Sequence, residues 1–209
     1  MSVIKTTHDE MNARERVLKL ARSRSVLRTR DTSAAGIHSG TLTRMSRAGE
    51  LERVGPGRYR LRANSMTEYQ DVVLAATAVP NSVVCLMSAL RFHGIGTQMP
   101  HEVWIAVPRG SRVPKLKAPP IRVVNMSPAL FDVGIEDHRI DGQVVRIHSV
   151  ARTVADCFRF RNKVGLDVAL EALTEAWRSK RLKLDELNRI AKKLRVQRVM
   201  QPYLETVVL

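Results

Sequence analysis

Aromatic residues and long apolar runs are scarce in this chain of 209 residues. Aromatics make up 4% of it, which disfavours recognition of single-stranded nucleic acid by base stacking. No run approaches the length of about 18 apolar residues that spans a bilayer. The first residues, MSVIKTTHDEMN, lack the apolar segment of a signal peptide. We therefore expect a cytoplasmic protein.

Cysteine is nearly absent as well. Cys85 and Cys157 lie far apart and in apolar surroundings, VVCLM and VADCF. This context is typical of buried thiols in a reducing compartment. No cysteine and histidine cluster has the spacing of a zinc site, and we expect neither a metal nor another cofactor.

Positive charge is what the chain has in excess. It holds 35 Lys and Arg against 20 Asp and Glu, a net charge of +15. Such a charge favours a polyanionic partner, either nucleic acid or an acidic membrane surface, and the scarcity of aromatics favours duplex DNA. Residues 1–64 contain 14 basic and 6 acidic residues (+8), more than half of the net charge. The polar stretch 62–68 then marks a candidate domain boundary.

The first 64 residues predict a defined order of short elements. Helical spacing of apolar residues, cap residues and turn glycines give helix, extended piece, helix, helix and two strands, at residues 7–24, 26–28, 30–35, 39–48, 51–54 and 58–61. Thr7 with Glu10 fits a capping box. Thr29 or Asp31 is expected to cap the second helix and Ser39 the third.

Glycines separate these elements. Gly36 is expected to end the second helix and Gly49 the third, and the short interval at Gly36 matches the sharp turn of a helix-turn-helix. The GPG at 55–57 is followed by the extended-looking RYRL, without a helix or a Gly-Lys-Ser/Thr. A nucleotide phosphate loop is therefore disfavoured. We predict a winged helix-turn-helix domain at residues 1–64.

Residues 65–209 predict a larger mixed α/β domain, so that the whole chain is α+β rather than a doubly wound sheet. The segment 83–93 reads as either strand or helix, ended by Gly94. Asp141-Gly142 is a strong hairpin signal. The other expected helices and strands lie at 69–79, 102–107, 121–126, 134–140, 143–149, 150–160, 166–180, 184–194 and 196–206.

The third helix carries the best candidate DNA contacts. Leu42 and Met45 should pack inward, which leaves a polar, basic face outside. Arginine can bind guanine or phosphate, and threonine can contact the backbone or a thymine methyl. A solvated basic helix and an ordinary hairpin are the alternatives. The predicted DNA-contacting residues of this helix and of the wing are Ser39, Thr41, Thr43, Arg44, Arg47, Arg58 and Arg60.

A second basic segment, PRGSRVPKLKAPP at 108–120, has four cations and no acid. Its four prolines exclude a regular element and predict an ordered loop. It is a candidate for contact with DNA phosphates or with an acidic protein, and a solubilising role is the alternative. The cations are Arg109, Arg112, Lys115 and Lys117. A third basic stretch, 178–198, is expected to be a solvated helix surface.

Titratable residues around one predicted hairpin are the best catalytic candidates: Glu136, Asp137, His138, Asp141 and His148. They suggest a metal-dependent nuclease or hydrolase. Strand alternation, however, places Asp137 on the face opposite Glu136 and His138, and Asp is a favoured turn residue at 141. No GxSxG is present. We therefore expect no catalytic residues and no enzyme.

Four segments resemble a known family: SALRFHG (88–94), PHEVWIA (100–106), ARTVADCFRFRNKVG (151–165) and GLDVALEAL (165–173). They look like the AbiEi antitoxins of type IV toxin–antitoxin systems, and the resemblance extends over about residues 10–207.

The resemblance implies a bacterial transcriptional autoregulator. Members of the family bind repeats in their own promoter through the N-terminal domain, and the C-terminal domain is needed for antitoxicity against a nucleotidyltransferase-like toxin. The family's DNA-contact region falls here on the third helix (Thr41, Thr43, Arg44, Arg47) and the wing (Arg58, Arg60). Two alternatives remain: a protein-interaction module that binds an acidic toxin, and an enzyme that acts on the toxin or on nucleic acid.

Overall fold

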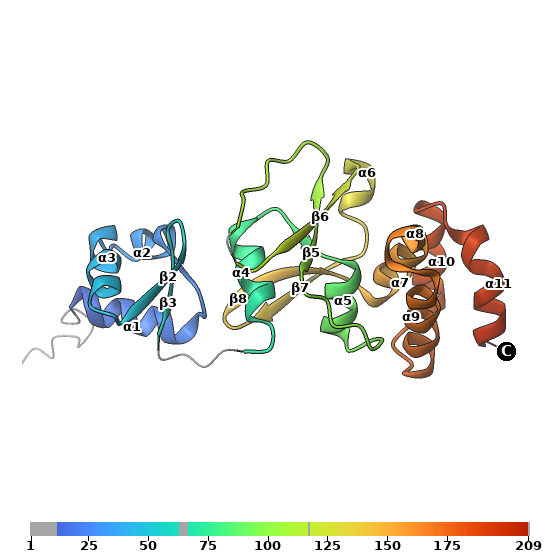
Figure 1. Cartoon of the computed structure of the whole chain (residues 1–209), viewed down its shortest axis with the longest axis horizontal. Coiled ribbons are helices and arrows are strands. Elements are labelled where there is room, and N and C mark those ends of the chain that lie inside the picture. Colours follow the sequence, from blue (N-terminus) through green and yellow to red (C-terminus); the bar gives the residue numbers. More distant parts are fainter. Residues whose placement is uncertain (1–11, 63–66, 117, 209) are drawn as a thin grey trace, which may run out of the picture. The chain divides into compact units, whose positions relative to one another are not determined.

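The computed structural model describes residues 12–62, 67–116 and 118–208 (Figure 1). The chain is a mixed α and β protein, which confirms the expected fold class. It divides into two compact units. One contains the described residues up to Leu74 together with Ile140–Gln143, and the other contains Ala75–Arg139 and Val144 onward.

The N-terminal unit packs three helices against a small antiparallel sheet with the strand order β1-β3-β2 (Figure 1, blue and teal). The elements are α1 (Ala13–Ser23), β1 (Leu27–Arg28), α2 (Thr29–Ala34), α3 (Ser39–Arg47), β2 (Leu51–Gly55) and β3 (Arg58–Leu61). A shared core of buried side chains joins them: Val17, Ala21, Leu27, Ile37, Leu42, Met45, Leu51 and Tyr59.

The helix caps differ from those predicted. Asn12 caps α1 in a capping box with Glu15, whereas the predicted pair Thr7 and Glu10 lies outside the described residues. Arg28, rather than Thr29 or Asp31, precedes α2. The Asp31 carboxylate, at the third position of α2, accepts from the Arg28 backbone N–H at 3.1 Å.

The predicted cap of α3 was also wrong by one residue. Ser39 is already helical, and the extended residue before it is His38, whose Nδ1 accepts the Gly40 N–H at 3.1 Å. Beyond α3, Gly49 has φ +77°, in the left-handed region that glycine adopts without a steric penalty. The helix therefore ends where the sequence predicted.

A five-stranded mixed sheet forms the centre of the second unit, with the strand order β6-β5-β4-β8-β7. Strand β4 is antiparallel to β5 and parallel to β8, and β5 is parallel to β6. The strands are β4 (Val83–Val84), β5 (Val103–Pro108), β6 (Ile121–Met126), β7 (Ile135–Ile140) and β8 (Gln143–His148). The ambiguous segment 83–93 resolves into the short strand β4 followed by helix α5.

Helices complete the chain: α4 (Gln70–Ala78), α5 (Leu86–His93), α6 (Pro128–Phe131), α7 (Val150–Arg159), α8 (Arg161–Val164), α9 (Leu166–Arg178), α10 (Leu184–Lys193) and α11 (Gln197–Val208). Helix α7 packs against α5, α9, α10 and α11. The short α6 was not predicted, although Pro128 at its start is a helix-start signal. Within the described ranges, none of the helices has both the length and the apolar character of a membrane span.

A charged cluster lies inside this unit. Arg152, which is fully buried, donates from Nε to the Asp156 carboxylate at 2.8 Å and from Nη1 to the carbonyl oxygens of Leu130 and Val133, each at 2.8 Å. Burial tends to raise the pKa of Asp156, but the contacts with His148 and Arg152 hold that pKa below its usual value. The cluster ties α7 to α6 and to the turn after it, because the carbonyl oxygens of Leu130 in α6 and Val133 in the turn accept hydrogen bonds from Arg152.

Candidate nucleic-acid interface

Helix α3 is amphipathic in the way the sequence predicted. Leu42 and Met45 are buried in the core of the N-terminal unit. Four of the predicted contact residues are exposed on the other side: Ser39, Thr43, Arg44 and Arg47. The two arginines lie three residues apart, so both extend from one side of the helix. The exposed surface of α3 therefore presents two hydroxyl side chains and two guanidinium groups.

Thr41 has a different environment from these four. It is 5% exposed, and its Oγ1 lies 3.5 Å from Nη2 of Arg44. Its hydroxyl thus faces an arginine of the same helix at the margin of the exposed surface. This geometry suits a side chain that orients Arg44 better than one that reaches a base.

The charges of α3 are available to a ligand. Among the residues that the structure describes, neither Arg44 nor Arg47 forms an ion pair with a carboxylate. The basic groups lie in the last turn of the helix, where a cation is favourable next to the helix C-terminus. An uncompensated guanidinium on a surface helix can bind phosphate or the guanine edge in the major groove.

The hairpin of β2 and β3 holds the two predicted wing arginines. Tyr59, between them, is 8% exposed and belongs to the core, so Arg58 and Arg60 lie on the opposite face of the sheet. Arg60 forms an ion pair with Glu52 at 2.7 Å. Partial burial lowers the pKa of Arg58. Arg60 is less available than the arginines of α3 because Glu52 compensates its charge, and Arg58 is less available because it is half-buried.

Sequence reasoning missed two exposed arginines in the same unit. Arg53 on β2 is exposed, and its Nε lies 3.4 Å from the Gly55 carbonyl oxygen, close to the turn of the hairpin. Arg30 is exposed on α2. No carboxylate pairs with either in the described part of the chain. The signal for Arg53 was its place two residues before the GPG turn.

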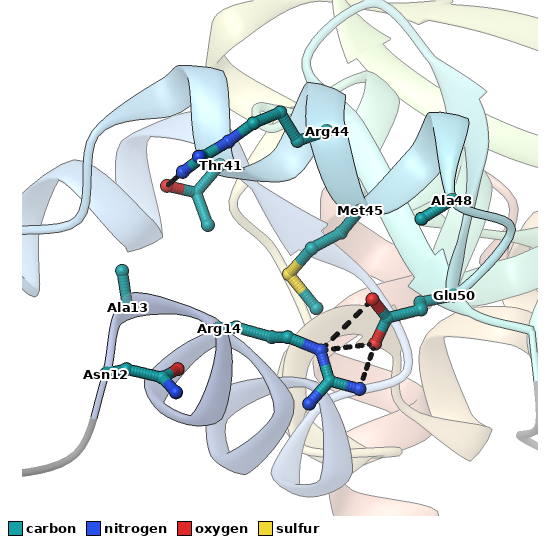
Figure 2. A pocket seen from close by; sticks show the side chains of 8 residues that line it. All are labelled: Asn12, Ala13, Arg14, Thr41, Arg44, Met45, Ala48 and Glu50. Carbon is teal, nitrogen blue, oxygen red and sulfur yellow. Dashed lines mark hydrogen bonds and ion pairs between the residues drawn. The ribbon is translucent and has the colours of Figure 1, made fainter.

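A shallow pocket of about 380 Å³ lies between the start of α1 and one side of α3 (Figure 2). Met45, Ala13 and Ala48 supply apolar atoms. Arg14 reaches across the pocket to the Glu50 carboxylate, with Nη2 to Oε2 at 2.7 Å. The complete lining is Asn12, Ala13, Arg14, Thr41, Arg44, Met45, Ala48 and Glu50. Arg44 therefore belongs both to this pocket and to the exposed surface of α3.

The predicted basic loop lies in the second unit, between β5 and β6 (Figure 1). Its start is fixed by a hydrogen bond from the Arg109 N–H to the Met126 carbonyl at 2.7 Å. The side chains of Arg109, Arg112 and Lys115 are exposed. The fourth predicted cation, Lys117, lies outside the described residues.

The titratable residues of the β7–β8 hairpin do not share one environment. His138 Nε2 lies 3.1 Å from the Glu136 carboxylate near the surface, whereas His148 is fully buried, with Nδ1 3.1 Å from Asp156. Asp141 occupies the turn with φ +48°. In the part of the chain described by the structure, no three of the His, Cys, Asp or Glu side chains are placed to hold a metal ion.

Comparisons with known proteins bear on this N-terminal unit and on the fold. The chain is similar in fold to the crystal structure of RV2827C protein from Mycobacterium tuberculosis, with a TM-score of 0.62, 16% identity and coverage of 93% of this chain and 77% of that chain. At this identity the likeness concerns the fold alone. Curated proteins gave no match.

The family comparison concerns the segment that holds α2, α3 and the hairpin. Residues 15–62 match the family model described as "Transcriptional regulator, AbiEi antitoxin". This match supports a role as an antitoxin or transcriptional regulator. The resemblance to the AbiEi family is thus confirmed over residues 15–62, the segment that matches the family's model.

Proposed function

We propose that the N-terminal unit is a winged helix-turn-helix that binds the promoter of its own operon, and that the chain acts there as an autorepressor. The observation that carries this proposal is the free basic surface of α3: Arg44 and Arg47 are exposed, lack carboxylate partners among the described residues, and stand on a helix fixed by the core. The element order with a β1-β3-β2 sheet agrees with a winged helix-turn-helix.

In the proposed complex α3 enters the major groove. Thr43, Arg44 and Arg47 meet base edges or phosphates, and Ser39 contacts the backbone near the start of the helix. The hairpin lies along the phosphate backbone, where Arg53 and Arg58 supply charge. Phosphate contacts provide much of the affinity, and the side chains in the groove provide the sequence preference.

The test is a gel-shift titration of the full chain with DNA from upstream of its own gene. Arg44→Ala and Arg47→Ala should each weaken binding by about 1–3 kcal/mol if they read bases. Arg22→Ala is the matched control, since Arg22 is an exposed arginine in the last turn of α1, and it should bind as the wild type does. Unchanged affinity in both α3 variants would exclude α3 as the recognition helix.

We further propose that the chain is the antitoxin of a type IV system and counteracts a nucleotidyltransferase-like toxin by binding rather than by catalysis. The family match over residues 15–62 supports the antitoxin role. The test is co-expression with the toxin encoded by the neighbouring gene. Rescue of growth by the wild type and by Glu136→Ala with His138→Ala is expected, and loss of rescue in that folded double variant would favour an enzyme.

A direct complex with an acidic toxin is the second candidate mechanism. It is favoured by one observation, the exposed and acid-free loop that carries Arg109, Arg112 and Lys115. Replacing these three by Ser should abolish co-purification of the toxin while DNA binding persists. Retention of the toxin by the triple variant would contradict this mechanism.

A further inference from the structure

The pocket between α1 and α3 combines an apolar floor with a rim that holds two cations and one carboxylate. Ala13, Met45 and Ala48 line it with methyl and methylene groups, and Asn12 and Thr41 add polar atoms (Figure 2). Its volume of about 380 Å³ falls within the range of small-molecule sites, which are mostly apolar with a few convergent polar groups.

One cation of the rim has no carboxylate partner in the described part of the chain. Arg14 is paired with Glu50, with Nε donating to Oε1 and Oε2 at 3.1 and 2.9 Å. Among the residues that the structure describes, Arg44 has a single long contact, 3.5 Å to Thr41 Oγ1. The two arginines and one carboxylate leave one positive charge at the pocket. A ligand with one negative charge and an apolar body would complement both the rim and the floor.

We propose that this pocket binds a small organic anion, an apolar monocarboxylate, and that the bound anion regulates DNA binding through Arg44. A carboxylate at the rim accepts hydrogen bonds from the Arg44 guanidinium while its apolar body covers Met45 and Ala48. A charge-assisted bond to a carboxylate is stronger than the neutral contact with Thr41. The link to DNA rests on the proposed function of α3.

The regulation follows from a shared group. Arg44 lines the pocket and also belongs to the exposed surface of α3. A guanidinium that is held by a carboxylate no longer meets DNA, so the anion and DNA compete for it. Because binding linkage is reciprocal, DNA must weaken binding of the anion by the same factor as the anion weakens binding of DNA.

The test uses the full chain labelled with ¹³C at the methionine methyl groups, with 2-naphthoate as the probe and the uncharged 2-naphthamide as its isostere. The Met45 signal is assigned from its absence in Met45→Leu. We expect 2-naphthoate to shift this signal saturably, and 2-naphthamide to bind at least about tenfold more weakly. Arg44→Gln should lose that preference for the acid. Arg47→Gln, on the same helix outside the pocket, should keep it.

The second measurement is the affinity for upstream DNA with and without 2-naphthoate. The probe should weaken DNA binding of the wild type and leave that of Arg44→Gln unchanged. No Met45 shift at about 10 mM probe, equal binding of the amide, or an equal shift by inorganic phosphate would overturn the assignment of the pocket. An intact DNA affinity at saturating probe would overturn the regulation.

The two proposals fail separately. Saturable binding of 2-naphthoate to a chain that does not bind DNA would support the anion site and reject the DNA-binding function. DNA binding without any shift of Met45 would support the function of α3 and reject the anion site.

Discussion

Arg152 shows at the scale of one residue how a charge can be held inside the second unit. Its guanidinium has a carboxylate on one side and two peptide carbonyls on another, all at 2.8 Å. Its own burial is complete. Removing one member of such a set leaves the other buried groups without partners, and that cost is larger than the net value of the pair.

Arg152→Met should therefore destabilise the chain by about 3–5 kcal/mol. Arg146→Met is the control, because Arg146 pairs at 3.2 Å with Asp132, whose side chain is 78% exposed. It should cost at most about 1 kcal/mol, as exposed pairs contribute little. Urea unfolding followed by circular dichroism measures both. Equal midpoints for the two variants would contradict the role assigned to Arg152.

His148 predicts a pH dependence of stability. Burial lowers its pKa below the usual 6.5, against the opposing effect of Asp156, while Arg152 and Arg146 nearby favour the neutral ring. The unfolded chain thus binds more protons than the folded chain as the pH falls through 6.5. The free energy of unfolding should fall with it. Burial lowers the pKa of His93 as well.

In His148→Gln this loss of stability between pH 7 and 5 should be smaller than in the wild type, since one of the two histidines with a lowered pKa is removed. His101→Gln serves as the control, because His101 is exposed. The measurement is urea unfolding at several pH values. An identical pH profile for wild type and His148→Gln would show that His148 does not contribute.

At the scale of elements, the pairing of β2 with β3 decides which wing arginine is free. Glu52 and Arg60 are directly opposite each other in the register, and their side chains form an ion pair. Arg53 lies opposite Tyr59 but is exposed and has no carboxylate partner in the described residues. The sequence favoured Arg58 and Arg60 because it shows the alternation of side chains along one strand. It does not show which residues of β2 and β3 lie opposite each other.

Arg53→Ala should accordingly weaken binding to upstream DNA more than Arg60→Ala does. We expect about 1 kcal/mol for Arg53, as for one phosphate contact, and less for Arg60, whose charge is already compensated by Glu52. Fluorescence anisotropy with labelled DNA measures the difference. A larger effect of Arg60→Ala would mean that the Glu52 pair opens in the complex.

The elements also show why part of the candidate site could be predicted from the sequence and part could not. The spacing of Leu42 and Met45 fixed the exposed side of α3, since an amphipathic helix has one way to bury its apolar residues. The pocket beside Thr41 and Arg44 depended on α1, which is distant in sequence and lines the pocket from its other side. The secondary structure of residues 83–93, which form β4 and then α5, was likewise ambiguous in the sequence, because a short buried apolar run fits either a strand or a helix.

At the scale of the whole molecule, a net charge of +15 makes association with DNA electrostatic. Each neutralised phosphate releases counterions, so the logarithm of the binding constant falls linearly with the logarithm of the salt concentration. In the complex that we propose, the surface charges of α3 and the hairpin set the number of such contacts.

We expect the affinity of the full chain for upstream DNA to fall about 100-fold between 50 and 200 mM salt, as for about four phosphate contacts. Arg47→Ala should reduce the slope by about 1 if Arg47 grips phosphate, and leave it unchanged if Arg47 reads a base. An unrelated DNA fragment of equal length is the control. An affinity that is independent of salt would reject phosphate contacts as a main contribution.

The sequence by itself determined the mixed fold class, the order of elements in the N-terminal unit and the exposed basic side of α3, because helical periodicity, turn glycines and charge are local properties. The tertiary structure alone decided which charges are free. Glu52 compensates Arg60, the peptide carbonyls of Leu130 and Val133 hold Arg152, and α1 forms a pocket beside Arg44. Each of these contacts joins separate elements, and packing rather than local propensity brings such groups together.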